Sequence, residues 1–244
     1  MPDRVEPFVI QVPEAALDDL RDRLRRTRWP EREPVDDWSQ GVPLEYLREL
    51  CGYWAERYDW RATEARLNRI PQFSTTIDGL DVHFLHVRSA HPGAVPIVMT
   101  HGWPGSFLEF ERAIGPLAAP GAVPFDVVVP SLPGYGFSGK PTTAGWDIHR
   151  IARAWAELMT RLGYGRFLAV GSDWGASVST SLALQHPDRL FGIHLVPPLA
   201  PADRTPAISP MTNARHSPTS TSAPVRGRGT PRSNAPVRRP LAIR

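Results

Sequence analysis

The stretch that decides the fold is Phe167-Leu-Ala-Val-Gly171-Ser-Asp173-Trp-Gly175. An apolar run leads into a glycine-flanked pentapeptide, and a run of small residues, 176–184, follows it. This order predicts a strand, a sharp turn and a helix, which is the layout of a nucleophile elbow. Glycines suit such a turn because bulky neighbours would clash with its strained central residue. The alternative is an ordinary tight turn in which Asp173 caps the following helix.

The central residue of this turn is Asp173, where the usual G-x-S-x-G motif has a serine. A carboxylate at an elbow can attack an alkyl carbon and form an ester. That chemistry suits epoxides or alkyl halides better than peptides. We therefore take Asp173 as the candidate nucleophile.

A second motif, His101-Gly102-Trp103-Pro104-Gly-Ser106, follows the apolar run 97–100. In an open α/β sheet this loop and the elbow lie together at the C-terminal edge of the strands, where such sheets bind ligands. Backbone N–H groups of Trp103 and Trp174 could then form an oxyanion hole for the intermediate formed when water attacks an aspartyl ester. The alternative is a proline turn in which His101 is hydrogen-bonded for structure.

A third motif, Pro133-Gly-Tyr135-Gly-Phe137-Ser138, follows the apolar run 125–129. Tyr135 and Phe137 could form the floor of a substrate pocket, together with the loop residues His101, Gly102 and Pro104. A glycine-rich loop with packed aromatic rings is the competing interpretation.

The rest of the chain predicts an α/β fold: a mostly parallel sheet with helices on both faces, preceded by a helical region. A short strand is expected at 8–13 and two strands at 73–77 and 80–87 around an Asp78-Gly79 turn. Alternating apolar runs and helical patterns follow. The expected helices are 14–28, 43–58, 60–68, 106–118, 147–162 and 176–186, and the other expected strands are 97–100, 125–129, 167–170 and 190–196.

Three regions are expected: a helical meander over 1–72, a partial α/β domain over 73–198 and a disordered tail over 199–244. The residues after 200 hold eight prolines and eight arginines and lack Trp, Phe and Tyr, so they bury too little apolar surface to fold. Two other interpretations stay open for the tail: a basic arm that binds an acidic partner, and non-native sequence produced by a frameshift in the gene.

The net charge of +3 belongs to this tail, because residues 1–203 carry 20 basic and 25 acidic side chains. The body therefore gives no reason to expect a nucleic-acid partner. The single cysteine excludes an intramolecular disulfide and fits the cytoplasm. We find no signal peptide and no apolar run of membrane-spanning length, and we expect no membrane partner, cofactor or metal.

Together these motifs resemble the α/β-hydrolase fold and, within it, the epoxide hydrolases. Residues 101–104, 133–138 and 171–175 match that family's oxyanion loop, glycine loop and aspartate elbow, and residues 8–30 and 46–87 look like the N-terminal region of its microsomal-type members. The resemblance implies that Asp173 attacks a small-molecule epoxide, helped by two lid tyrosines. A histidine oriented by an acid would then activate water to hydrolyse the ester.

The sequence departs from this pattern after residue 198, where the family places its lid, orienting acid and histidine. No tyrosine follows Tyr164, and none of the eight histidines is nominated as the base. We expect a truncated or frameshifted chain whose run 190–196 is an exposed sheet edge. Such a chain should aggregate or stay partly unfolded, without measurable epoxide turnover.

Two other functions remain open. A haloalkane dehalogenase relative would use the same aspartate elbow, but those enzymes tend to have Asn at the position of Trp103 and lack the N-terminal meander. A non-catalytic fragment or partner-binding module would be soluble and stable without turnover. Neither the substrate nor the oligomeric state follows from the sequence.

Overall fold

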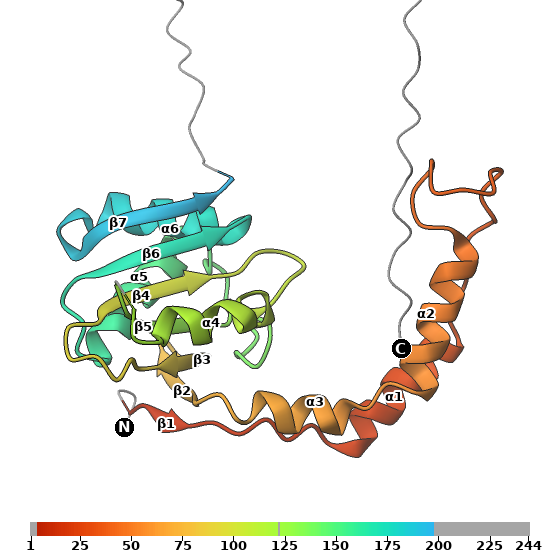
Figure 1. Ribbon diagram of the computed structural model, residues 1–244, viewed down its shortest axis with the longest axis horizontal. Coiled ribbons are helices and arrows are strands. Elements are labelled where there is room, and N and C mark those ends of the chain that lie inside the picture. Colours follow the sequence, from red (N-terminus) through yellow and green to blue (C-terminus); the bar gives the residue numbers. More distant parts are fainter. Residues whose placement is uncertain (1–3, 122, 198–244) are drawn as a thin grey trace, which may run out of the picture. The chain divides into compact units, whose positions relative to one another are not determined.

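The computed structural model describes residues 4–121 and 123–197, which fall in the first of two units, Met1–Pro201 and Ala202–Arg244. The expected disordered tail lies outside the described residues. The elements, in chain order (Figure 1), are β1 (Glu6–Pro7), α1 (Glu14–Arg25), α2 (Leu44–Glu56), α3 (Trp60–Leu67), β2 (Gln72–Ile77), β3 (Leu80–Val87), β4 (Val95–Thr100), η1 (Phe107–Phe110), α4 (Glu111–Ala118), β5 (Phe125–Pro130), α5 (Ile148–Arg161), β6 (Phe167–Ser172), α6 (Trp174–Gln185), η2 (Pro187–Arg189) and β7 (Leu190–Val196).

The seven strands form one sheet in the order β1-β2-β3-β5-β4-β6-β7. The pairs that involve β1, β2 and β3 are antiparallel, and β5, β4, β6 and β7 pair in parallel. The α/β fold is confirmed, but the sheet is mixed rather than mostly parallel. The Asp78-Gly79 hairpin and its extended partner β1 account for the antiparallel half.

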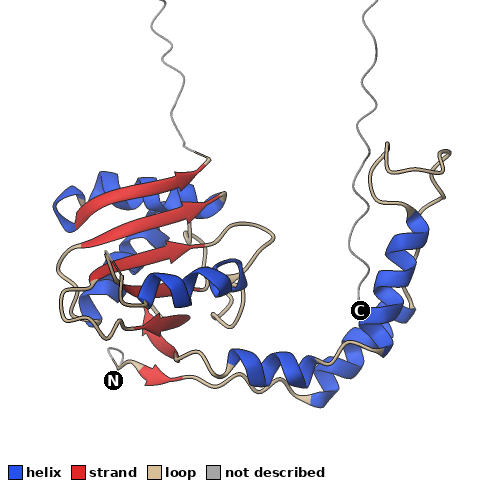
Figure 2. Cartoon of the chain, in the orientation of Figure 1, coloured by secondary structure: helices blue, strands red, loops and turns tan. Residues whose placement is uncertain are grey.

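Helices cover both faces of the sheet, with α4 on one side and α5 and α6 on the other (Figures 1 and 2). Alternate side chains of a strand point to opposite faces. Accordingly Val128 of β5 packs in the core with Trp155 of α5, whereas Val127 and Val129 pack with Ile114 of α4. Each face therefore has its own buried apolar core, and the parallel strands lie between the two.

Several boundaries differ from the expectations. The predicted helix 106–118 is a 3₁₀ turn, η1, followed by α4, and the helix predicted to reach residue 28 ends at Arg25. The predicted strand 8–13 was wrong in position, since strand pairing is confined to Glu6–Pro7. Beyond it the Phe8 N–H still donates to the Gln72 carbonyl. The Asn68 side chain then bonds both the N–H and the carbonyl of Ile10, at 2.8 and 2.9 Å.

In residues 4–121 and 123–197 we find no helix that combines the length and the apolar character needed to cross a membrane.

Candidate active site

The turn between β6 and α6 has the geometry of an elbow. Asp173 lies at φ 50° and ψ −118°, a positive φ that is uncommon for a residue with a side chain. Its carbonyl accepts the Ala176 N–H at 3.0 Å, and its own N–H donates to the Val196 carbonyl of β7 at 3.0 Å. The side chain is exposed, so the sharp turn presents the carboxylate at the surface.

Two glycines let the backbone close around this turn. A Cβ at Gly171 would overlap the carbonyl of Gly175, and a Cβ at Gly175 would overlap the carbonyl of Thr100 in β4. Both glycines are buried, so no side chain has an outward path from these positions. The spacing of the pentapeptide therefore reflects close backbone approach between β4, β6 and α6.

The Asp173 carboxylate is held by backbone N–H groups. The Trp103 N–H donates to its Oδ1 at 2.8 Å across 70 residues of sequence. Hydrogen bonds from the N–H groups of Trp103 and, second, Trp174 hold the pKa of this carboxyl below its usual value. The loop after β4 and the start of α6 thus place both expected donors at the carboxylate, which stays ionised at neutral pH.

His101 is not a pocket-lining side chain, because it is fully buried. Its Nδ1 lies 3.0 Å from the Gly102 carbonyl oxygen, and its Nε2 accepts the Leu132 N–H at 3.1 Å. The ring therefore joins the loop after β4 to the loop after β5. Gly102 is buried as well, whereas Trp103 and Pro104 are exposed.

A cavity of about 440 Å³ opens beside Trp174. Its lining is mostly apolar and aromatic, and it includes Tyr135 from the loop after β5 and Trp146 just before α5. The complete lining set is Leu132, Pro133, Tyr135, Pro141, Trp146, Asp147, Ile148, Ile151, Trp174 and Val178. Asp147 is its one carboxylate, and that side chain already accepts the Arg150 N–H as the cap of α5.

Phe137, expected to share the pocket floor with Tyr135, packs in the interior instead. Its ring centroid lies 5.5 Å from Phe8, 5.4 Å from His83 and 6.1 Å from Phe107. The glycine-rich loop 133–138 therefore sends one aromatic ring to the cavity and one to the core. Sequence alone could not separate these directions, because both rings follow a glycine.

Sequence reasoning did not identify Glu109. This carboxylate accepts the Ser172 hydroxyl at 3.0 Å, which ties η1 to the residue before the nucleophile. Its side chain also passes directly over Gly105, where any Cβ would overlap it. Both residues could be read from the sequence, Ser172 before the elbow aspartate and Glu109 three residues after Ser106. Their hydrogen bond could not be predicted, because it depends on the fold.

The other described histidines do not hydrogen-bond Asp173 in the part of the chain that the structure describes. His83 bonds Ser131 and Gln72, His86 bonds the Tyr164 hydroxyl, and His149 bonds the Ser181 hydroxyl. Burial lowers the pKa of His83 and His86 to about 4, so both are neutral at pH 7. Each of these three rings thus has a hydrogen-bond partner outside the elbow and the loop after β4.

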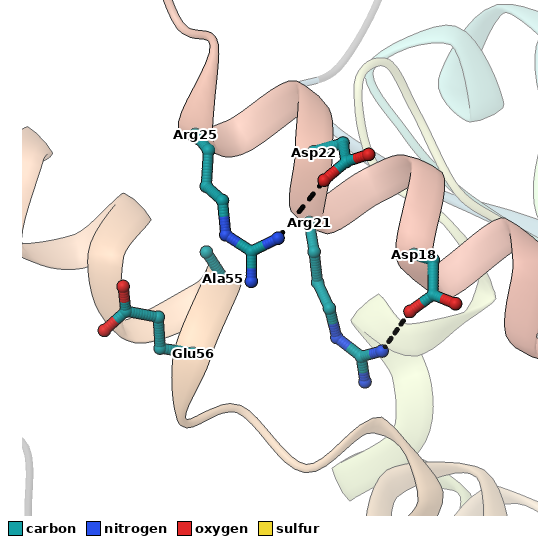
Figure 3. Close-up of a pocket in the computed structure, with 6 residues that line it drawn as sticks. All are labelled: Asp18, Arg21, Asp22, Arg25, Ala55 and Glu56. Carbon is teal, nitrogen blue, oxygen red and sulfur yellow. Dashed lines mark hydrogen bonds and ion pairs between the residues drawn. The ribbon is translucent and has the colours of Figure 1, made fainter.

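A second hollow of about 640 Å³ lies between α1 and α2 and has a different character. Figure 3 shows Arg21 directed at Asp18 and Arg25 directed at Asp22, at 2.8 and 3.2 Å. Ala55 and Glu56 of α2 complete the lining. Its two guanidinium groups are thus paired with two of its three carboxylates.

Comparison with known families agrees with this geometry. A family model described as "Epoxide hydrolase N terminus" matches residues 5–110. A second, described as "alpha/beta hydrolase fold", matches residues 95–219. The second match, with the sheet and the elbow, places the chain in the α/β-hydrolase class. Within that class the chain belongs to the epoxide hydrolase family.

Individual relatives carry the same names. A protein of Stigmatella aurantiaca named as a candidate epoxide hydrolase is 56% identical over 208 residues, covering 83% of this chain and 47% of that protein. Epoxide hydrolase 1 of Oryctolagus cuniculus is 37% identical over 201 residues, covering 78% and 44%. The chain thus spans about half the length of the curated relatives it matches.

The structure of Aspergillus niger epoxide hydrolase superposes with a TM-score of 0.72 at 36% sequence identity. The match covers 86% of this chain and 55% of that one. The likeness therefore extends through both the N-terminal region and the sheet.

Proposed function

We propose that Asp173 opens an epoxide by nucleophilic attack and becomes an alkyl ester, as the first half of an epoxide hydrolase reaction. The bond from Oδ2 of Asp173 to an epoxide carbon forms while the C–O bond of the ring breaks. The released oxygen takes a proton from an acid or from water. This is the reaction class that fits a carboxylate at an elbow.

One observation carries the proposal: a strained turn exposes a carboxylate whose Oδ1 is held by the Trp103 N–H at 2.8 Å. That oxygen would become the ester carbonyl, and the same donor would stabilise the oxyanion when water attacks. The low pKa of Asp173 supports the proposal too, because the nucleophile is the ionised form.

The cavity beside Trp174 supports an apolar substrate. Its volume of about 440 Å³ suits a small organic molecule, and its aromatic rings would bind the substituent of an epoxide. The Asp147 carboxylate is occupied by the α5 backbone and would disfavour an anionic substituent.

The second half of the reaction needs a base to activate water. The family resemblance places this base after residue 198, and none of the eight histidines of the sequence is nominated for it. For a purified chain of these 244 residues we therefore expect ester formation without sustained diol production.

The test is to incubate this purified chain with styrene oxide and to measure its intact mass. We expect an increase equal to one styrene oxide molecule, with peptide mapping placing it on Asp173. Asp173→Asn should abolish the adduct, and Asp188→Asn is the matched control because that carboxylate is exposed on η2.

Three outcomes would contradict the proposal. The wild-type chain could stay unmodified, or the adduct could persist in Asp173→Asn. A faster reaction with an alkyl halide, with halide release, would favour a dehalogenase instead. Continuous diol formation that disappears in Asp173→Asn would refute the expectation that the chain stops at the ester.

A further inference from the structure

The hydrogen bonds of His101 determine its tautomer. The Leu132 N–H can only donate, so the Nε2 atom that it approaches at 3.1 Å carries no proton. The proton of the neutral ring is therefore on Nδ1, and Nδ1–H donates to the Gly102 carbonyl oxygen at 3.0 Å. Burial lowers the pKa of this histidine, against smaller opposing effects of the hydrogen bond to the Gly102 carbonyl and then of the Glu109 carboxylate.

The Gly102 carbonyl belongs to the same peptide group as the Trp103 N–H. In a trans peptide these two groups point in opposite directions, and the described cis bonds are elsewhere, at Trp103–Pro104 and Val196–Pro197. His101 therefore bonds one end of this peptide while Asp173 bonds the other. The contact is direct, because a Cβ at Gly102 would overlap the Asp173 side chain.

We propose that His101 is a positioning residue: its Nδ1–H holds the Gly102–Trp103 peptide in the one orientation that directs the Trp103 N–H at the Asp173 carboxylate. Without this bond the peptide is free to rotate about its flanking single bonds. A rotated peptide would turn the Gly102 carbonyl toward Asp173, where two oxygen atoms bearing negative charge repel.

Buried anchoring on both sides of the ring makes this arrangement specific. Leu132 follows β5, and its N–H keeps the ring from turning about its own axis. The Tyr135 ring packs edge-on against the imidazole, with centroids 5.7 Å apart. The loop after β5 thus reaches the nucleophile through His101, although it has no hydrogen bond to Asp173 in the described residues.

The experiment is an NMR titration of the Asp173 side-chain carboxyl carbon in the full chain. Wild type should titrate below the usual aspartate range, and His101→Ala should move the midpoint up toward that range. The amide proton of Trp103 should follow the Asp173 titration in wild type and lose this response in His101→Ala.

Two conservative variants separate a positioning role from a merely structural one. In His101→Asn the side-chain amide can replace Nδ1–H as the donor to Gly102, so the low midpoint should return. In His101→Gln the amide reaches the Nε2 position, so Leu132 keeps a partner but the Gly102 carbonyl does not. This variant should titrate like His101→Ala.

His83→Ala is the control for the loss of a buried ring. His83 is as buried as His101 and has two ring partners, Ser131 and Gln72, but neither belongs to the elbow or its loop. It should lower stability and leave the Asp173 midpoint unchanged. A folded His101→Ala chain with the wild-type midpoint, or a His101→Asn chain that fails to restore it, would overturn the proposal.

The catalytic meaning of this role rests on the proposed function, but its test does not. The titration reads the carboxyl group directly and needs no epoxide. A chain that lacks the adduct but shows the His101-dependent midpoint would contradict only the proposed function. A chain that forms the adduct but whose Asp173 midpoint does not depend on His101 would contradict only the role of His101.

Discussion

Two helices of similar length show that the N-terminal helical region and the sheet region are stabilised by different interactions. In α1 the one buried residue is Leu17, and ion pairs such as Arg23–Asp19 cover the surface. In α5 seven residues are buried, including Trp155, which is completely inaccessible. The elbow is attached to the second kind of structure, so its geometry depends on apolar packing and close backbone contact.

The N-terminal region relies instead on polar links to its own backbone. Glu64 of α3 accepts the Val12 N–H at 2.7 Å, and Asn68 bonds both backbone groups of Ile10. The Val12 N–H and then the Arg61 guanidinium hold the pKa of Glu64 below its usual value. Substitutions should therefore have large effects in the sheet region and modest ones in the helical region.

The largest effect is expected for Gly175→Ala. Its methyl group would overlap the Thr100 carbonyl, and the backbone of β4 or α6 would have to move. We expect a loss of about 5 kcal/mol or more, comparable to the whole stability of a domain. Urea unfolding followed by circular dichroism measures it.

The matched control is Gly115→Ala in α4, where a Cβ meets nothing within 4 Å. Alanine has the better helix propensity, so this variant should gain about 0.5–1 kcal/mol. Equal effects at the two positions would show that close approach does not govern the elbow.

Trp155→Ala comes next, with an expected loss of about 3–5 kcal/mol. The change empties a fully buried site and removes the Trp155 Nε1–H bond to the Thr100 hydroxyl, 3.1 Å long. Trp54→Ala in α2 is the control, because that ring is 46% exposed, and it should cost less than about 1 kcal/mol. Equal losses in denaturation curves would remove the contrast between the two regions.

Acid should act on the sheet region through His83. Burial lowers its pKa from 6.5 to about 4, so the unfolded chain takes up the proton first as the pH falls below 6.5. Stability should decrease from there to about pH 4, by about 3 kcal/mol from this residue, and no further below. His83→Gln should remove that part of the slope between unfolding curves at pH 7 and pH 4.

The comparison for this slope is between wild type and His83→Gln, each unfolded at both pH values. If His83→Gln keeps the wild-type slope, the buried imidazole is not its source.

The smallest effect is expected for Asn68→Ala, which removes both bonds to Ile10. A loss of about 1–2 kcal/mol should follow, with faster hydrogen exchange at residues 8–12. Asn68→Asp keeps the acceptor for the Ile10 N–H, so its stability should lie between those of wild type and Asn68→Ala. Faster exchange throughout the sheet would mean that the two regions do not separate.

The sequence predicted most elements of the sheet because their signals are local. The run 190–196 is a strand with the expected bounds, and 80–87 pairs with β2 around the expected turn. The extended segment at Ile10 could not be predicted in this way, since its partners are side chains 58 residues away. The antiparallel pairing of β3 with β5 also depends on which strand ends meet, and no local pattern encodes that.

The features of the candidate site likewise divide into those that the sequence predicted and those that it could not. The spacing of Gly171, Asp173 and Gly175 indicated the turn, and the loop at 101–106 indicated a donor. The directions of His101 and Phe137 were not predictable, because burial of a polar or aromatic ring is decided by what packs above it. The link between Glu109 and Ser172 joins residues 63 apart and needed the fold.

The hydrogen bond from the Asp173 N–H to the Val196 carbonyl has a consequence for motion. β7 is the last strand of the described sheet, and strands at such a position open more readily than central ones. Fraying at Val196 would release the elbow amide while β4 and β6 stay paired. Hydrogen exchange at the Asp173 amide would then report the opening rate of this outer strand.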